Sequence, residues 1–131
     1  MKRSILYLDD EAACLSIFKA TFGDDYDVCT AVTLAQASLL LSERPFDIVI
    51  SDQSMPEIKG TEFLRQVAEK YPATRRVILT GTAHVGDVIP QLINGVVQFF
   101  IVKPWTPESV QQVLDRAYSS FDPRSRPQGR E

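Results

Sequence analysis

The stretch Phe46-Asp-Ile-Val-Ile-Ser-Asp-Gln-Ser-Met-Pro-Glu-Ile-Lys-Gly60 decides the fold of this 131-residue chain. Residues 48–50 form a short β-branched run, typical of a strand that is buried on both faces in the middle of a parallel sheet. Asp52 stands where that strand is expected to end, just before Met55 and Pro56 turn the chain. In open α/β sheets this end of a central strand faces the crevice in which ligands bind, so Asp52 is the first candidate functional residue.

The rest of the chain alternates between strand-like and helix-like stretches. Short apolar runs predict five strands, at residues 4–8, 27–31, 48–51, 76–80 and 98–102. Apolar residues at helical spacing predict five helices, at residues 12–22, 33–44, 60–71, 87–93 and 106–121. This alternation indicates right-handed crossovers and a parallel sheet covered on both faces. We therefore predict an α/β fold: a flavodoxin-like, doubly wound, five-stranded parallel sheet with strand order 2-1-3-4-5 and five helices.

Two helix starts carry informative residues. The fourth helix contains Pro90, which cannot donate a backbone hydrogen bond and would cost about 3 kcal/mol deeper in a helix. We therefore expect Pro90 in the first turn of a helix that begins late, near Asp87, or else a distorted helix. The last helix has clear start signals, because Thr106 offers a capping hydroxyl and Pro107-Glu108 suits the first turn.

Composition limits the classes of protein. The chain has the length of one domain, and its 44% hydrophobic content is ordinary for a globular protein. A net charge of −3 does not favour direct nucleic-acid binding. The lack of a long apolar run or a signal peptide argues against membrane association and predicts a cytoplasmic protein. We expect one domain at residues 1–121, followed at residues 122–131 by a disordered tail or the start of a linker.

The two cysteines are expected to be structural. Cys14 and Cys29 lie in apolar surroundings without the spacing of metal ligands or redox pairs, and the chain has one His. We therefore predict two buried, unpaired thiols in a reducing compartment rather than a disulfide or a metal site.

Polar side chains stand at the carboxyl ends of four predicted strands: Asp9 and Asp10 after the first, Asp52 after the third, Thr80 at the fourth and Lys103 after the fifth. Because these strands end at one edge of the sheet, we expect the five side chains to lie together. Three carboxylates crowded beside one ammonium are costly unless a cation joins them, and oxygen ligands in this number suit Mg²⁺. The cation, the lysine and the threonine would then form a site for a phosphoryl group on Asp52, since phosphoryl transfer needs positioning and charge neutralisation.

Each of these residues has a simpler explanation when it is taken alone. The pair Asp9-Asp10 could be a turn or a helix cap, Thr80 an ordinary strand-end residue and Lys103 a solvated side chain before a proline. Their conjunction at matching ends of alternate elements favours the phosphoryl site.

Four segments combine into a highly specific pattern: Leu8-Asp9-Asp10-Glu11, Ser51-Asp52-Gln53-Ser54-Met55-Pro56-Glu57-Ile58-Lys59-Gly60, Leu79-Thr80-Gly81 and Val102-Lys103-Pro104-Trp105. Together they resemble the receiver domain of two-component response regulators, the family of the bacterial chemotaxis regulator. The resemblance covers residues 4–121, so the domain expected at residues 1–121 would be a receiver domain.

The resemblance implies a phosphorelay function. Asp52 would accept a phosphoryl group from a histidine kinase or a histidine phosphotransfer protein. Asp10 and Asp52 would bind Mg²⁺ directly, with Mn²⁺ as a possible substitute, while Asp9 would bind mainly through water and the backbone carbonyl of Ser54 would complete the ligands. Such a protein is a signalling switch rather than a turnover enzyme, although it catalyses its own phosphorylation and slow dephosphorylation.

The resemblance also implies how the signal leaves the site. Thr80 and Lys103 would contact the phosphoryl oxygens, and the Lys103-Pro104 peptide would be cis. Thr80 would be drawn toward the added negative charge, and Phe100 would rotate into the space that Thr80 leaves. A downstream protein, or a C-terminal effector domain missing from this chain, would read that change.

Three other functions fit the residues less well. A haloacid dehalogenase-like phosphohydrolase would need a second Asp two residues after its nucleophile and a cap insertion. A flavin-binding flavodoxin would need a Ser/Thr/Gly-rich phosphate loop after the first strand. A degenerate receiver that acts only through protein contacts would lack a site residue, and here all are present.

Overall fold

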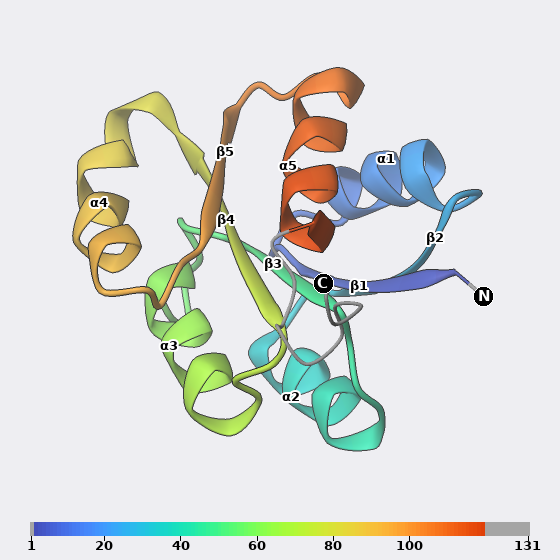
Figure 1. Ribbon diagram of the computed structural model, residues 1–131, viewed down its shortest axis with the longest axis horizontal. Coiled ribbons are helices and arrows are strands. Elements are labelled where there is room, and N and C mark those ends of the chain that lie inside the picture. The colour runs from blue at the N-terminus through green and yellow to red at the C-terminus, as the bar shows by residue number, and fades with distance from the viewer. Residues whose placement is uncertain (1, 120–131) are drawn as a thin grey trace, which may run out of the picture.

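Strands and helices alternate along the chain in the computed structural model, which describes residues 2–119 (Figure 1). The strands are β1 (Arg3–Leu8), β2 (Tyr26–Ala31), β3 (Ile48–Asp52), β4 (Arg75–Gly81) and β5 (Phe99–Lys103). The helices are α1 (Ala12–Phe22), α2 (Leu34–Glu43), α3 (Gly60–Lys70), α4 (Val85–Ile93) and α5 (Pro107–Ser119), with a short 3₁₀ helix η1 (Thr82–His84) before α4. The predicted tail at residues 122–131 lies outside the described residues.

The five strands form one parallel sheet in the order β2-β1-β3-β4-β5, as the sequence predicts. Parallel pairing aligns Leu8 of β1 with Ser51 of β3, and Asp52 of β3 with Leu79 of β4. Thr80 of β4 in turn aligns with Val102 of β5. The carboxyl ends of four strands therefore reach the same edge of the sheet, which we call the carboxyl edge.

Both faces of the sheet are covered, which explains the continuous apolar runs of the central strands. Helices α1 and α5 lie on one face and α2, α3 and α4 on the other (Figure 1). In β1, Ile5 and Tyr7 pack toward α1 and α5, whereas Leu6 and Leu8 pack toward α2 and α3. All five residues of β3 are buried, so the strand that carries Asp52 is held from both sides.

The predicted cap at Thr106 is confirmed, whereas the predicted late start of α4, with Pro90 in its first turn, is wrong. Thr106 accepts a hydrogen bond from the Ser109 amide at 3.1 Å at the start of α5. Pro90, however, lies past the first turn of α4, which begins at Val85 rather than near Asp87. The missing amide deprives only the carbonyl of Gly86, four residues earlier, of its helical partner. Gly86 is exposed, so water can satisfy that carbonyl and the helix tolerates the proline.

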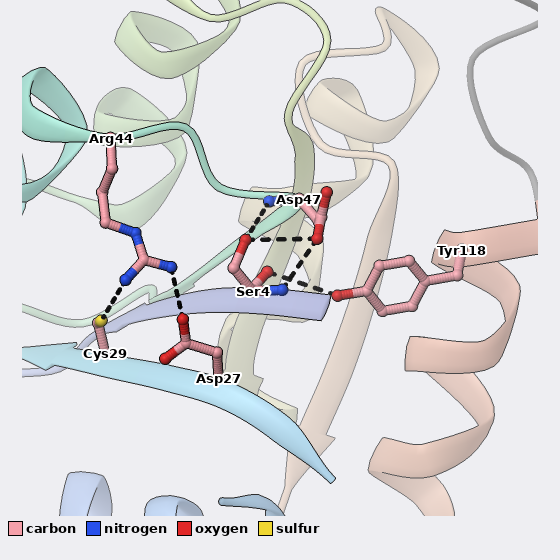
Figure 2. A network of polar contacts seen from close by, with 6 residues as sticks. All are labelled: Ser4, Asp27, Cys29, Arg44, Asp47 and Tyr118. Atoms are coloured by element: carbon pink, nitrogen blue, oxygen red, sulfur yellow. Dashed lines mark hydrogen bonds and ion pairs between the residues drawn. The ribbon is translucent and has the colours of Figure 1, made fainter. Parts of the chain in front are cut away.

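A polar network joins β1, the start of β3 and the end of α5 at the amino ends of the strands, the amino edge (Figure 2). The amide of Ser4 donates to Oδ2 of Asp47 at 2.9 Å, and the Asp47 amide donates to Oγ of Ser4 at 3.0 Å. The Tyr118 hydroxyl donates to the Ser4 carbonyl at 3.4 Å. These bonds fix the entry to β3 and the last turn of α5 against the first strand.

The cysteines are unpaired, as predicted, but the prediction that they are buried is wrong, since both are partly exposed. Cys29 lies on β2, an edge strand, and packs against the margin of the core. Beside it the Arg44 guanidinium pairs with Asp27 at 2.7 Å and reaches the Cys29 sulfur at 3.7 Å (Figure 2). Within the described residues, no helix has the length and apolar character required to cross a bilayer.

Candidate functional site

The carboxyl edge brings together the charged residues that the sequence singles out. Asp9 and Asp10 follow β1, Asp52 ends β3 and Lys103 ends β5. The Nζ atom of Lys103 forms an ion pair with Oδ1 of Asp52 across the intervening strand. The Lys103-Pro104 peptide that follows is cis, as expected.

Three carboxylates converge at this edge. Oxygens of Asp9, Asp10 and Asp52 all lie within 4.8 Å of one another. Asp9 and Asp52 are buried, while Asp10 is exposed, so the cluster opens to solvent on the Asp10 side. A set of hard oxygen donors with one open side fits a divalent cation that keeps part of its water shell.

Asp52 experiences opposing influences. Burial raises the pKa of its carboxyl above the ordinary value, the hydrogen bond from Lys103 works against that rise, and the charge of Asp9 adds to it. The Ser54 amide also donates to Oδ2 of Asp52 at 3.1 Å. Burial lowers the pKa of Lys103, but its contacts with Asp52 outweigh that effect and raise the pKa overall. Lys103 is therefore protonated at neutral pH, beside a carboxyl whose charged form is disfavoured by burial.

Among the described residues, neither of the two predicted switch residues is hydrogen-bonded to the Asp52 carboxylate, whose partners are Lys103 and the Ser54 amide. Thr80 is buried, and its hydroxyl donates to the carbonyl of Gly81 at 3.2 Å. Phe100 lies in β5 and is 37% exposed, whereas Phe99 is half-buried and packs on the α1–α5 side. Ser54 is exposed and contributes its amide, not its carbonyl, to the contacts among the described residues.

Sequence reasoning missed Tyr7, which lies within the apolar run of β1. Its hydroxyl is fully buried and donates to Oδ2 of Asp9 at 2.7 Å, while the Glu11 amide donates to Oδ1 at 2.9 Å. Burial, followed by the hydrogen bond to Asp9, raises the pKa of Tyr7 well above its usual range. The available signal was the strand period of two, which places residues 7 and 9 on the same side of the chain.

Gln53 and Gly60 belong to the sequence pattern at residues 51–60, and the structure shows what each of them contacts. Gln53 is buried, and its side-chain oxygen accepts from the Thr61 amide at 2.9 Å while its carbonyl accepts from the Gly60 amide at 3.1 Å. A Cβ atom at Gly60 would overlap the carbonyl oxygen of Asp52 and lie 2.6 Å from Cδ1 of Ile78. Glycine is therefore needed because the first turn of α3 presses against the end of β3.

Trp105 supports the turn that follows the lysine. Its ring is partly buried against α1, with centroid distances of 6.0 Å to Phe18 and 6.1 Å to Phe22. Phe18 in turn packs edge to face on Tyr7 at 4.9 Å. One aromatic cluster thus lies under both the acidic residues and the turn that carries Lys103.

A doubly wound sheet with three carboxylates and one lysine at its carboxyl edge defines a receiver-type signalling domain. The residue pattern of the response regulator receiver domain matches residues 5–115, and the chain belongs to that family.

Known proteins agree with this assignment. The chain is 28% identical over 114 residues to the hydrogenase transcriptional regulatory protein HoxA of Cupriavidus necator, covering 87% of this chain and 24% of HoxA. It is 33% identical over 108 residues to the alginate biosynthesis transcriptional regulatory protein AlgB of Pseudomonas aeruginosa, covering 82% of this chain and 24% of AlgB. The chain therefore spans about a quarter of the length of these curated relatives.

Among solved structures, a response regulator receiver domain protein from Clostridium thermocellum superposes with a TM-score of 0.83 at 26% identity. The superposition covers 90% of this chain and 95% of that one. The match extends over nearly the whole of both chains, so the fold of the present chain is that of a receiver domain.

Proposed function

We propose that Asp52 is the phosphoacceptor of a two-component signalling switch, and that its donor is a phosphohistidine on a histidine kinase or a histidine phosphotransfer protein. The observation that carries the proposal is the ion pair between Asp52 and Lys103 beside two further carboxylates at the carboxyl edge. A nucleophile, a fixed positive charge and a cation-binding set of oxygens thus meet at one point, and membership of the receiver family supports the same reading.

The transfer step needs one bond exchange. A carboxylate oxygen of Asp52 attacks the phosphorus, the new O–P bond forms as the P–N bond to the donor imidazole breaks, and the imidazole nitrogen keeps the electron pair of that bond. Lys103, released from its pairing with the free carboxylate, places its ammonium against the phosphoryl oxygens. The Ser54 amide is positioned to donate to the other oxygen of Asp52.

The residues that would hold Mg²⁺, or Mn²⁺ in its place, are Asp10 and Asp52 directly, Asp9 mainly through water and Ser54 through its carbonyl. The bound cation supplies positive charge against the phosphoryl oxygens. Water attack on the phosphorus would return free Asp52 and inorganic phosphate. While the phosphoryl group is on Asp52 it carries nearly two negative charges. These charges would attract the hydroxyl of Thr80 away from the Gly81 carbonyl and toward the phosphoryl oxygens.

The output of the switch is a change at β4 and β5. Movement of Thr80 would open space next to β5, and Phe100, which is already partly exposed, would rotate inward to fill it. A downstream protein or an attached effector domain would recognise the altered surface. HoxA and AlgB are named as transcriptional regulatory proteins, and an effector of that kind is one reader that fits.

The proposal is tested with acetyl phosphate and MgCl₂, followed by intact mass spectrometry and two-dimensional NMR. We expect one labile phosphoryl group, absent from Asp52→Asn and retained by Asp115→Asn, a matched change of an exposed Asp on α5. Phosphorylation should shift the resonances of Thr80 and Phe100. A stably unphosphorylated wild-type protein would contradict the proposal, and steady release of phosphate from varied phosphate monoesters would support a hydrolase instead.

A further inference from the structure

The side chain of Asp9 is held on both of its oxygens. Oδ2 accepts from the Tyr7 hydroxyl at 2.7 Å, and Oδ1 accepts from the Glu11 amide at 2.9 Å. The backbone amide of Asp9 is also engaged, donating to the Ala31 carbonyl at 3.1 Å. Since Tyr7 and Asp9 are both fully buried, water does not compete for the hydrogen bond between them. Asp9 is therefore fixed in one orientation.

The ring of Tyr7 has little freedom to release Asp9. It packs edge to face against Phe18 at 4.9 Å, and Phe18 packs against Trp105 at 6.0 Å. Helix α1 thus packs on the ring through Phe18, and Trp105 in the turn after β5 packs on Phe18 in turn. Core packing therefore fixes the direction in which the Tyr7 hydroxyl points, which is toward Asp9.

The three carboxylates of the cluster differ in the donors they already have. Each oxygen of Asp9 has one strong donor, which uses about half of the lone-pair directions of that carboxylate. Asp52 is engaged by Lys103 and the Ser54 amide. Among the described residues, no side chain or amide donates to the carboxylate of Asp10, which is exposed. The carboxylate most open to a cation is therefore Asp10, and one of the least open is Asp9.

We propose that Tyr7 is a positioning residue that determines cation specificity, an inference that rests on the function proposed above. By holding Asp9 with a hydrogen bond, Tyr7 limits the number of carboxylates that can bind the ion directly. Mg²⁺ is bound through few carboxylates and keeps several waters, whereas Ca²⁺ takes six to eight oxygen ligands in a flexible arrangement. A fixed Asp9 therefore favours Mg²⁺ over Ca²⁺.

The effect of removing the hydroxyl has a definite direction. In Tyr7→Phe the buried Oδ2 of Asp9 loses its donor, and binding an ion becomes the way to satisfy it. Asp9 gains freedom to turn toward the cluster and add a third direct carboxylate. Ca²⁺, with its larger and more flexible coordination shell, gains more from an added ligand than Mg²⁺ does.

The test compares Mg²⁺ and Ca²⁺ affinities by isothermal titration calorimetry of the wild-type protein and Tyr7→Phe. We expect the ratio of Ca²⁺ affinity to Mg²⁺ affinity to rise about tenfold in Tyr7→Phe, the scale seen when partners of metal ligands are removed. Tyr26→Phe is the matched control, since Tyr26 is also buried and its hydroxyl accepts from Gln111 on α5, away from the cluster. It should leave the ratio unchanged.

An unchanged ratio in a folded Tyr7→Phe protein that is still phosphorylated on Asp52 overturns the role of Tyr7 alone. Wild-type protein that binds neither ion overturns both this inference and the cation site. If Tyr7→Phe does not fold, NMR of the wild-type protein tests whether Tyr7 still holds Asp9 when Mg²⁺ is bound. The slowly exchanging hydroxyl proton of Tyr7 should persist at saturating Mg²⁺, and its loss on Mg²⁺ binding overturns the inference.

Discussion

At the scale of single residues, opposing effects act on the charge of the Asp52 carboxyl, the proposed phosphoacceptor. Burial and the neighbouring Asp9 favour the protonated form of Asp52, while Lys103 favours the ionised form, and the balance leaves its pKa raised. A carboxyl whose pKa is higher in the folded protein than in the unfolded chain adds stability at low pH and loses that contribution as the pH rises through its folded pKa. The free protein is thus less stable for keeping Asp52 ionised at neutral pH.

This balance predicts a pH-dependent difference between wild type and Asp52→Asn. In EDTA, the wild-type free energy of unfolding should fall relative to that of Asp52→Asn as the pH rises from about 4 to about 8, because only the wild type must ionise a buried carboxyl. Urea denaturation at several pH values measures the difference. Asp115→Asn, on the exposed face of α5, should follow the wild type. Parallel curves for wild type and Asp52→Asn would contradict the raised pKa.

A sequence pattern reveals a single functional residue only when that residue departs from the pattern around it. Asp52 and Lys103 could be predicted because a charge ending an apolar strand is conspicuous. Tyr7 could not, since a tyrosine in a buried strand fits the core, and only the geometry of its hydroxyl gives it a partner. The partial exposure of Cys29 could not be predicted either, because it depends on the place of β2 at the edge of the sheet.

At the scale of elements, a buried arginine joins two connections that precede strands. Arg76, near the start of β4, donates to the carbonyls of Val96 at 2.7 Å, Thr74 at 2.8 Å and Gly95 at 3.2 Å. Burial lowers the pKa of its guanidinium. The chain before β4 and the α4–β5 connection are therefore tied to each other by one side chain. The sequence places Arg76 at the start of a strand, but does not reveal the carbonyls that surround it.

Arg76→Met should reduce the free energy of unfolding by about 2–4 kcal/mol, because one buried and two partly buried carbonyls lose their donor while the packing volume is largely kept. Chemical denaturation with constant m-value measures this loss. The control is Arg65→Met on α3, where the arginine is exposed and pairs with Glu62 and Glu69, and there we expect a much smaller change in the free energy of unfolding. Equal effects of the two substitutions would show that the carbonyl contacts contribute nothing.

Helix α4 shows the limit of element prediction. The cost of proline in a helix interior predicts Pro90 in the first turn. In the structure the carbonyl that loses its partner belongs to the exposed Gly86, and burial of Val88 stabilises the helix. Tertiary packing thus extends α4 to Val85, where local preference alone would start it later.

At the scale of the whole molecule, the fold could be predicted because every level of pattern agreed on it. Strand length, helix period and caps all support the same alternation, and the right-handed crossover rule leaves few topologies. The cluster of three carboxylates at the carboxyl edge follows from that topology. The hydrogen bond of Thr80 does not, because a hydroxyl can turn to any nearby acceptor.

A cation that binds only the folded protein must stabilise it. We predict that Mg²⁺ raises the free energy of unfolding by about 2.7 kcal/mol when its free concentration is about one hundred times the dissociation constant. Asp10→Asn should abolish this gain, and Asp24→Asn, exposed at the opposite end of the sheet in the turn after α1, should keep it. Thermal unfolding with MgCl₂ or EDTA measures the effect. A melting temperature unaffected by Mg²⁺ would contradict the prediction that the cation binds at this site.

The network of Ser4, Asp47 and Tyr118 has a practical consequence for protein engineering. The bonds that join the first strand, the entry to the third and the final helix lie at the amino edge, at the opposite end of the sheet from Asp52 and Lys103. If Asp52 is the phosphoacceptor, as proposed above, loops at the carboxyl edge can be exchanged among homologues to change the choice of phosphodonor without disturbing this network.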